Sequence, residues 1–427
     1  MNYGLIGEHL PHSFSKEIHA LCADYIYELH ELTPDDVEGF MKAAEFTAIN
    51  VTIPYKRTVM PYLHHIHPHA ESIGAVNTVV NKNGELYGYN TDFYGMRSLI
   101  RRVGIDPMDK KALVLGTGGA AHTAVAVLKD MGAKEVLVVE RWETDEFISY
   151  ETACRDHADA EVIVNATPCG MYPYPDGNEN IKGTPIDLSA FPNLCGVVDA
   201  VYNPLRTNLV QDAKDRGIPA EGGLYMLVAQ AVMASRIFRG YVDEAFDDEA
   251  SMDQESERIF KIILSDKENI VLTGMPGSGK STVGKALSEL LGRPFVDTDA
   301  LIVERAGKPI SDIFAEVGEA GFRDLESQVV KETANSLTGH IIATGGGAIL
   351  RDENVRALRR TGRLYFLNRS LEALIPTHDR PLASTVDAIR KRFEERYDRY
   401  LATADREVVI DEEIEHTVQT IREDFFS

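Results

Sequence analysis

Two glycine-rich loops are the parts of this sequence whose residue types and spacing point most directly to chemistry. The first is LGTGGAAHTA at Leu115–Ala124, and the second is TGMPGSGKST at Thr273–Thr282. A loop that ends in Gly118 and Gly119 allows a helix N-terminus to approach the pyrophosphate of a dinucleotide. The second loop has the pattern GxxxxGKS, in which backbone N–H groups, a lysine and a metal-binding hydroxyl surround a nucleoside triphosphate. One loop therefore indicates redox chemistry, and the other indicates phosphoryl transfer.

The elements that must position these loops are strands and helices in alternation. Each loop follows a short apolar run and precedes a segment of helical length. This rhythm continues along the chain and predicts parallel α/β sheets. The predicted strands are Tyr3–Ile6, Ala48–Val51, Ala112–Leu115, Glu135–Val139, Val162–Asn165, Gly196–Asp199, Asn269–Leu272, His340–Ala343 and Leu364–Leu367, and the helices after the two loops are Ala120–Met131 and about Lys280–Leu291.

Composition limits the classes of partner. The net charge of −23 argues against nucleic acid or an anionic membrane surface as the main partner, because both favour a basic face. No stretch approaches the roughly 18 apolar residues of a membrane span, and no signal peptide is evident at the N-terminus. The four cysteines form no CxxC pair, so neither a disulfide framework nor a zinc ribbon is expected. We therefore expect a cytoplasmic protein, whose oligomeric state the sequence leaves open.

Seven motifs around the first loop follow one another in the order of a known family. Over about 240 residues the N-terminal half resembles shikimate dehydrogenase. The resemblance implies a substrate-binding α/β domain, a Rossmann domain and the NADPH-dependent reduction of 3-dehydroshikimate to shikimate. The motifs are HSFSKEIH at His12–His19, NVTIPYK at Asn50–Lys56, IGAVNTVV at Ile73–Val80, GYNTD at Gly88–Asp92, NATPCGM at Asn165–Met171, VYNP at Val201–Pro204 and GGLYMLVAQA at Gly222–Ala231.

The reduction of a ketone needs a proton donor, because hydride transfer develops negative charge on the carbonyl oxygen. Lys56 and Asp92 can supply such a donor and its partner, although out of context they would be interpreted as a surface lysine and a helix cap. By resemblance they are the catalytic pair. The resemblance also assigns substrate contacts to Ser13, Ser15, Thr52, Asn77, Tyr202, Gly223 and Gln230, and dinucleotide contacts to Gly116, Gly118, Gly119, Ala120 and Arg141.

Two positions depart from the family pattern. Lys16 stands where a proline usually follows the second serine of the first motif, which affects the stiffness of that loop. After the second predicted Rossmann strand the sequence is ERWETD from Glu140 to Asp145, where the family commonly has Asn-Arg-Thr and a further arginine for the 2′-phosphate of NADP. Only Arg141 matches, and Glu140 could bind a free ribose hydroxyl instead. NADP is expected, and NAD remains an alternative.

The motifs around the second loop resemble shikimate kinase over about 155 residues. The resemblance implies a P-loop domain similar to nucleoside-monophosphate kinases, with ATP as donor and the 3-hydroxyl of shikimate as acceptor. The motifs beyond the loop are DTD at Asp297–Asp299, ISDIFAEVGEAGFRDLE at Ile310–Glu326, GGG at Gly345–Gly347, RPL at Arg380–Leu382, and Arg396 four residues before Tyr400.

The acceptor is a small carboxylate, so its site needs fixed cations and a group that orients one hydroxyl. By resemblance, Arg323 and Arg396 hold the carboxylate, Asp299 acts on the hydroxyl, and Arg380 closes a lid that lacks a further arginine upstream. Phe314 and Phe322 would pack beside the ring, unless they are plain core. The glycines Gly345, Gly346 and Gly347 approach the substrate, the phosphate-binding residues are Gly277, Ser278, Gly279, Lys280, Ser281 and Thr282, and Ser281 and Asp297 hold Mg²⁺.

These features predict four segments: a substrate domain at 1–95 that is completed by a helix at about 222–240, a Rossmann domain at 96–221, an acidic linker or frayed helix at 241–266, and a kinase domain at 267–427. Two alternatives remain. The N-terminal half could be a broader quinate/shikimate dehydrogenase that uses NAD, or one half could be a non-catalytic module. A metal site at His64, His65, His67 and His69 is disfavoured, because that segment resembles an ordinary dehydrogenase helix and turn.

Overall fold

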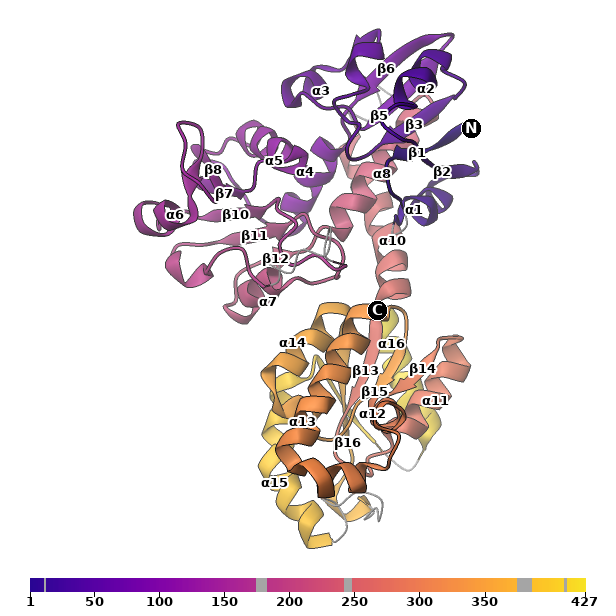
Figure 1. Cartoon of the computed structure of the whole chain (residues 1–427), viewed down its shortest axis with the longest axis vertical. Coiled ribbons are helices and arrows are strands. Elements are labelled where there is room, and N and C mark those ends of the chain that lie inside the picture. The colour runs from indigo at the N-terminus through magenta and orange to yellow at the C-terminus, as the bar shows by residue number, and fades with distance from the viewer. Residues whose placement is uncertain (11–12, 174–182, 242–247, 375–385, 411–412) are drawn as a thin grey trace. The chain divides into compact units, whose positions relative to one another are not determined.

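The computed structural model describes residues 1–10, 13–173, 183–241, 248–374, 386–410 and 413–427. The chain divides into two compact units, Met1–Ile263 and Leu264–Ser427 (Figure 1). Both units are α/β, as the sequence predicts. None of the described helices combines the length and the apolar character that a membrane span requires.

The first sheet, in the N-terminal unit, has the strand order β2-β1-β3-β5-β6-β4. Strands β1 and β3 pair in parallel, so the loops after both strands leave the sheet at one edge. The strands are β1 (Tyr3–Gly7), β2 (Tyr27–Glu31), β3 (Ala48–Val51), β4 (His65–Ile66), β5 (Thr78–Lys82) and β6 (Glu85–Tyr89), with helices α1 (Ser15–Cys22), α2 (Val37–Ala43) and α3 (Pro68–Ile73).

The prediction of purely parallel sheets was wrong for this sheet. Strands β5 and β6 form an antiparallel hairpin, and β5 is also antiparallel to β3. The hairpin turns at Asn83 and Gly84, whose φ angles of 55° and 94° are both positive. An Asn-Gly pair between two apolar runs is the usual signature of such a two-residue turn, so the sequence did carry the signal.

The second sheet has the order β12-β11-β10-β7-β8-β9, and its strand pairs are parallel. Helix α5 connects the adjacent parallel strands β7 and β8, which is the arrangement of a βαβ dinucleotide unit. The strands are β7 (Lys111–Leu115), β8 (Glu135–Glu140), β9 (Ile148–Ser149), β10 (Val162–Asn165), β11 (Gly196–Asp199) and β12 (Ala220–Glu221), and the helices are α4 (Asp92–Arg102), α5 (Gly119–Asp130), α6 (Tyr150–Asp156) and α7 (Asn208–Asp215).

Helix α8 (Leu224–Phe238) packs against α1 and α4 and against strands β3 and β5 of the first sheet. Nearly all of its residues are buried. The helix α10 (Glu249–Lys267) occupies most of the segment predicted as an acidic linker or frayed helix. Its apolar residues Met252, Ile259 and Phe260 are buried. The boundary between the two compact units, after Ile263, also lies within this segment.

The acidic residues of α10 pair with arginines of the N-terminal unit, which explains why so polar a helix packs. Asp253 Oδ1 accepts hydrogen bonds of 2.8 Å from both Tyr94 and Ser98 of α4, and its Oδ2 lies 2.9 Å from Arg101. The guanidinium of Arg236 on α8 lies 3.0 Å from Glu255. These charged side chains have partners of opposite charge and remain partly exposed.

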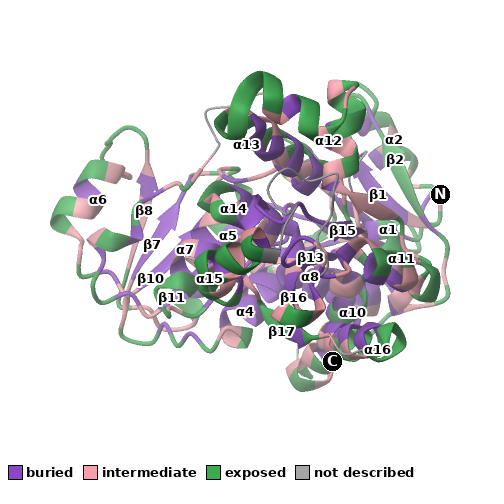
Figure 2. Cartoon of the chain, turned by 90° about the horizontal axis from the view of Figure 1, so that it is seen from below, coloured by how far each residue is buried: buried purple, intermediate pink, exposed green. Residues whose placement is uncertain are grey.

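The C-terminal unit contains a five-stranded parallel sheet in the order β14-β15-β13-β16-β17. Its strands β13 and β15 are buried along their whole length, and Figure 2 draws buried residues in purple. The strands are β13 (Asn269–Thr273), β14 (Phe295–Asp297), β15 (Ile341–Ala343), β16 (Gly362–Asn368) and β17 (Arg406–Val409), and the helices are α11 (Lys280–Leu291), α12 (Thr298–Ala306), α13 (Ile310–Ser336, kinked at Gly318), α14 (Asp352–Thr361), α15 (Val386–Thr403) and α16 (Ile414–Phe426).

Candidate active sites

Predicted residues from six separate motifs meet at one cavity of about 490 Å³ in the N-terminal unit. The carboxyl ends of β1 and β3, the start of α4 and one face of α8 bring them there. Gly223 lies outside this lining, at the start of α8, where a side chain would meet the Ala200 carbonyl oxygen at 2.2 Å. The predicted residues on the cavity wall are Ser13, Ser15, Thr52, Lys56, Asn77, Asp92, Tyr202 and Gln230.

Lys56 and Asp92 form an ion pair in this cavity, with 2.6 Å between Nζ and Oδ2. Their side chains are 25% and 16% exposed, so both are accessible to a small molecule and yet partly shielded from water. Asp92 is the first residue of α4, where the helix dipole favours a negative charge. The pair therefore places an ammonium proton donor beside a fixed carboxylate.

A buried hydrogen-bond network supports the cavity wall. Asn77 Oδ1 accepts from the backbone N–H of Thr91 at 2.8 Å, and the Thr91 hydroxyl donates to Gln230 Oε1 at 3.2 Å. Asn50, which the site prediction missed, lines the cavity and donates to the Asn77 carbonyl at 3.2 Å. An asparagine inside an otherwise apolar buried strand was the available signal, because a buried amide needs partners.

The network extends from Asn50 through Tyr27 to His19. The Tyr27 hydroxyl donates to Asn50 Oδ1 at 2.8 Å, and the His19 ring stacks on Tyr27 with centroids 3.9 Å apart. His19 is 1% exposed. Burial lowers its pKa from 6.5 to about 3, against the opposing effect of a hydrogen bond with Asn50. The imidazole is therefore neutral in the folded protein at physiological pH.

The first glycine loop has the shape that a pyrophosphate requires. Gly116 has φ +99°, and a side chain there would meet Thr167 at 2.9 Å. Positions Gly118 and Gly119 face open space at the N-terminus of α5, and no described side chain caps Gly118. Ala120 lies in the first turn of the same helix. Exposed N–H groups at the start of a 12-residue helix fit an anionic dinucleotide.

The acidic residue at the end of β8 contacts this loop directly. Glu140 Oε2 accepts from the Thr117 hydroxyl at 3.1 Å, and Oε1 accepts from the Arg141 backbone N–H at 2.8 Å. The carboxylate thus stands at the rim of the predicted pyrophosphate site, with the exposed Arg141 next to it. In βαβ dinucleotide units this position faces the ribose on the adenine side.

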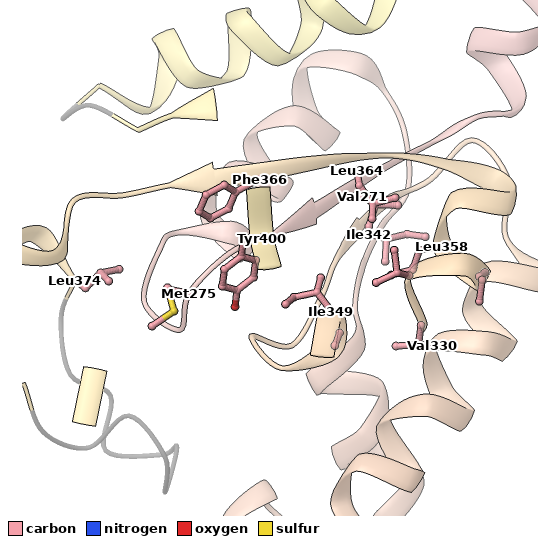
Figure 3. Close-up of a cluster of buried hydrophobic side chains, with 14 of the residues drawn as sticks. Val271, Met275, Val330, Ile342, Ile349, Leu358, Leu364, Phe366, Leu374 and Tyr400 are labelled. Carbon is pink, nitrogen blue, oxygen red and sulfur yellow. The ribbon is translucent and has the colours of Figure 1, made fainter. Parts of the chain in front are cut away.

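The second glycine loop is closed around its own lysine. Lys280 Nζ donates to the carbonyl oxygens of Gly274 at 2.9 Å and of Met275 at 3.0 Å. Figure 3 shows Met275 among the buried side chains of this unit, near the stacked rings of Phe366 and Tyr400. The hydrophobic core therefore anchors the loop. The predicted phosphate-binding residues Gly277, Ser278, Gly279, Ser281 and Thr282 belong to this loop and to the start of α11.

Ser281 and Asp297, the pair predicted to hold Mg²⁺, are adjacent. The Ser281 hydroxyl donates to Asp297 Oδ2 at 2.6 Å, and Asp297 Oδ1 accepts from the backbone N–H of Asp299 at 3.0 Å. One hydroxyl and one carboxylate beside a phosphate loop form a donor set of hard oxygen atoms, which suits Mg²⁺. The described residues contain no group of three histidine, cysteine or acidic side chains that could hold a metal ion by themselves.

The Gly345–Gly347 segment packs against the predicted acceptor residues so closely that no side chain fits. A Cβ at Gly345 would lie 2.5 Å from Asp299 Oδ1, and a Cβ at Gly347 would lie 2.0 Å from Arg323 Nη1. Arg396 Nη1 donates to the Gly346 carbonyl at 3.2 Å. The structure thus brings together Asp299, both predicted arginines and the three glycines.

Glu326 is a buried part of this group that the site prediction missed. Its carboxylate lies 2.7 Å from Arg323 and is 1% exposed. Burial raises the pKa of Glu326, while Arg323 acts in the opposite direction. Its second oxygen has no hydrogen-bond partner among the described atoms and lies 2.7 Å from where a Gly345 side chain would begin. The spacing of Arg323 and Glu326, three residues apart on a helix, was the available signal.

Arg369 is a second residue that the prediction missed. It follows β16, and its Nη1 lies 3.9 Å from where a side chain at Gly279 would begin, so it faces the phosphate loop. Arg380, the predicted lid residue, lies outside the described residues. Phe314 and Phe322 stack with centroids 4.5 Å apart and belong to a hydrophobic cluster with Ile302.

An acid–base pair in a cavity beside a βαβ unit, followed by a P-loop domain with an arginine-lined acceptor site, defines a fusion of an oxidoreductase with a small-molecule kinase. Comparisons with known proteins agree with each half. Residues 5–79 match the shikimate dehydrogenase substrate binding domain family, and residues 276–425 match the shikimate kinase family.

Individual relatives are similar to the N-terminal half of the chain. A shikimate dehydrogenase (NADP(+)) from Clostridium perfringens is 36% identical over 265 residues, which are 58% of this chain and 96% of that protein. The solved chorismate mutase/shikimate 5-dehydrogenase fusion from Clostridium acetobutylicum is 34% identical with a TM-score of 0.53, covering 61% of this chain and 96% of the other. The Thermus thermophilus shikimate 5-dehydrogenase in complex with NADP(H) and shikimate is 28% identical with a TM-score of 0.50, covering 61% and 99%.

The chain belongs to the shikimate dehydrogenase family and carries a shikimate kinase domain after it in the same polypeptide. It is a bifunctional enzyme of the shikimate pathway. The sequence-based prediction of both activities is thereby confirmed.

Proposed function

We propose that the N-terminal unit reduces 3-dehydroshikimate to shikimate with NADPH, and that the C-terminal unit phosphorylates the 3-hydroxyl of shikimate with ATP and Mg²⁺. The observation that carries the first half is the pair Lys56 and Asp92, 2.6 Å apart in a cavity whose wall also holds the predicted hydroxyl and amide groups. All four cysteines are free, which supports a reducing, cytoplasmic location.

In the dehydrogenase, the nicotinamide supplies the hydride when the dinucleotide is bound. Lys56 donates a proton to the carbonyl oxygen as negative charge develops there, because its ammonium is the cationic donor on the cavity wall. Asp92 holds that ammonium in position and accepts a hydrogen bond from a substrate hydroxyl. The hydroxyls of Ser13 and Ser15 donate to the substrate carboxylate, and Asn77 contacts a ring hydroxyl.

In the kinase, Arg323 and Arg396 bind the carboxylate of shikimate, with Glu326 fixing the angle of the Arg323 guanidinium. Asp299 orients the attacking hydroxyl and accepts its proton. Lys280 neutralises charge on the transferring phosphoryl group, which requires its ammonium to exchange a loop carbonyl for a phosphate oxygen. Ser281 and Asp297 would hold Mg²⁺, which supplies charge neutralisation at the phosphates.

The choice between dinucleotides is the finer part of the proposal. We expect NADPH to be preferred, in line with the relatives named above. The specific alternative is an NAD-dependent quinate/shikimate dehydrogenase, and Glu140 favours it because a carboxylate at the ribose repels a 2′-phosphate. Initial rates with each cofactor, and with quinate as well as shikimate, decide between the two. A kcat/KM that is higher for NADH would refute the NADPH assignment.

Paired variants test the chemistry and exclude a non-catalytic half. We expect Lys56→Met to reduce dehydrogenase kcat by at least about 100-fold while the kinase rate stays unchanged. Lys280→Met should do the reverse, because the two lysines belong to separate units. The unchanged rate of the other unit corrects each measurement for the amount of enzyme. Retention of dehydrogenase activity by Lys56→Met, or of kinase activity by Lys280→Met, would refute the role proposed for that lysine.

A further inference from the structure

Trp142 is an exposed aromatic side chain beside the predicted dinucleotide site. It is the single tryptophan of the chain, and it is 78% exposed. It lies two residues beyond Glu140, the last residue of β8. A large indole left in water forgoes the stabilisation of apolar burial, and tryptophans at protein surfaces frequently bind a partner. The neighbouring site that could supply such a partner is the predicted dinucleotide site at the end of β8.

The register of the second sheet places Trp142 on the adenine side of the glycine loop. Leu115 of β7 lies opposite Val139 of β8, and the Gly116 N–H donates to the Val139 carbonyl at 2.8 Å. The end of β8 is therefore adjacent to the N-terminus of α5. In such units the pyrophosphate lies on the helix N-terminus and the adenine-side ribose lies at the acidic residue after the second strand. Here that residue is Glu140, and Trp142 follows it by two residues.

We propose that the indole of Trp142 stacks on the adenine ring of the bound dinucleotide. This inference rests on the proposed function, since it requires a dinucleotide at the first glycine loop. Stacking on an aromatic side chain recognises the flat face of a base and does not depend on the 2′ substituent of the ribose. Trp142 therefore strengthens the binding of NADP and NAD equally, while the choice between them lies with Glu140 and Arg141.

The experiment uses the emission of the single tryptophan of the full-length enzyme. NADP⁺ and NAD⁺ should each quench Trp142 emission with saturation, and nicotinamide mononucleotide, which lacks adenine, should not quench it with saturation. Because the kinase unit contains no tryptophan, binding of a dinucleotide to the P-loop adds no second emitter. The measurement therefore reports on binding and does not depend on catalysis.

Calorimetry on variants measures how much Trp142 contributes to the affinity for the dinucleotide. Trp142→Ala should raise the Kd of NADP⁺ and of NAD⁺ by the same factor, about tenfold, and Trp142→Phe should restore most of the affinity. Ile26→Ala is the matched control, because Ile26 is equally exposed in the same unit at 81% and lies outside the cavity lining. Its Kd values should equal those of the wild type. The KM for shikimate and the kinase rate should not change in any of the three variants.

Two results would overturn the proposal while the proposed function stands: unchanged Kd values in Trp142→Ala, or no quenching by dinucleotides that calorimetry shows to bind. A blue shift of Trp142 emission that follows protein concentration and not dinucleotide would instead place the indole between copies of the chain, and would also overturn it. If neither dinucleotide binds the wild-type enzyme, the proposed function itself fails.

Discussion

Replacement of Gly347 by alanine is a direct test of the acceptor site in the kinase. Gly347 has φ −108° and ψ −3°, a conformation that alanine adopts without strain. The added methyl would lie 2.0 Å from Nη1 and 2.2 Å from Cζ of Arg323, whereas ordinary contacts begin at 3.4 Å. Arg323 cannot turn aside freely, because its guanidinium lies 2.7 Å from the buried carboxylate of Glu326. The arginine must therefore move by more than an ångström within a packed site.

The expected effect follows from that displacement. A misplacement of about 1 Å in a positioned group can cost up to about 100-fold. We expect the KM for shikimate to rise by about 10-fold to 100-fold, which corresponds to about 1.4 to 2.7 kcal/mol of binding free energy. The kcat should fall less, because Arg323 holds the carboxylate in both the ground state and the transition state.

Steady-state kinase rates at varied shikimate and ATP measure the effect, and the dehydrogenase rate of the same sample is the internal control. Gly346→Ala is the matched comparison, because its methyl would lie 2.8 Å from the Pro276 ring in the phosphate loop. That variant should raise the KM for ATP more than the KM for shikimate. A shikimate KM within twofold of wild type in Gly347→Ala would refute the placement of Arg323.

Three further predictions concern other parts of the chain. Burial lowers the pKa of His19 to about 3, so the contribution of the neutral imidazole to stability is complete above pH 6.5 and is lost as the pH falls below that value. Between pH 7.5 and 5.5, the free energy of unfolding of the N-terminal unit, measured in urea, should therefore fall by about 1.4 kcal/mol more in the wild type than in His19→Phe. Equal losses would contradict this. Asp253→Ala should destabilise the same unit by about 2 kcal/mol, since three donors lose their acceptor, and should leave kinase unfolding unchanged. Arg369→Ala should raise the Kd of ADP about fivefold, with Arg369→Lys intermediate; an unchanged Kd in calorimetry would show that Arg369 does not face the nucleotide.

Much of the fold could be predicted because the local patterns agree with the tertiary structure. The buried parallel strands are continuous apolar runs, and Val162–Asn165 and Gly196–Asp199 were predicted with the bounds that they have. Short edge strands such as β9 and β12 were missed, since two residues give no periodicity. The helix α10 was obscured because its stability depends on arginines that lie about 150 residues earlier in the sequence.

Some residues of the candidate sites could also be predicted from the sequence, and others could not. Residues within motifs, such as Lys56 and Arg323, could be found because their neighbours identify them. Asn50 and Glu326 belong to the same motifs and were still missed, because they act through other side chains whose distances come from the structure. The proximity of Arg369 to Gly279 depends on the pairing of β13 with β16, which no local pattern of residues encodes.

Helix α10 has a practical consequence for separating the two enzymes. Its residues up to Ile263 pack in the N-terminal unit, and only Glu268 separates its end from β13 of the kinase. Glu268 is itself buried, and its carboxylate lies 3.2 Å from Arg363. A protease cut or gene truncation within the acidic stretch would thus remove a packed helix from the dehydrogenase, and one placed after Glu268 would remove a buried ion pair from the kinase. The two compact units meet between Ile263 and Leu264, inside this helix. The carbonyls of Ser265 and Lys267 already accept hydrogen bonds from Arg293 and Gly339 of the kinase unit, so a division of the chain that spares both enzymes has to fall next to Ile263.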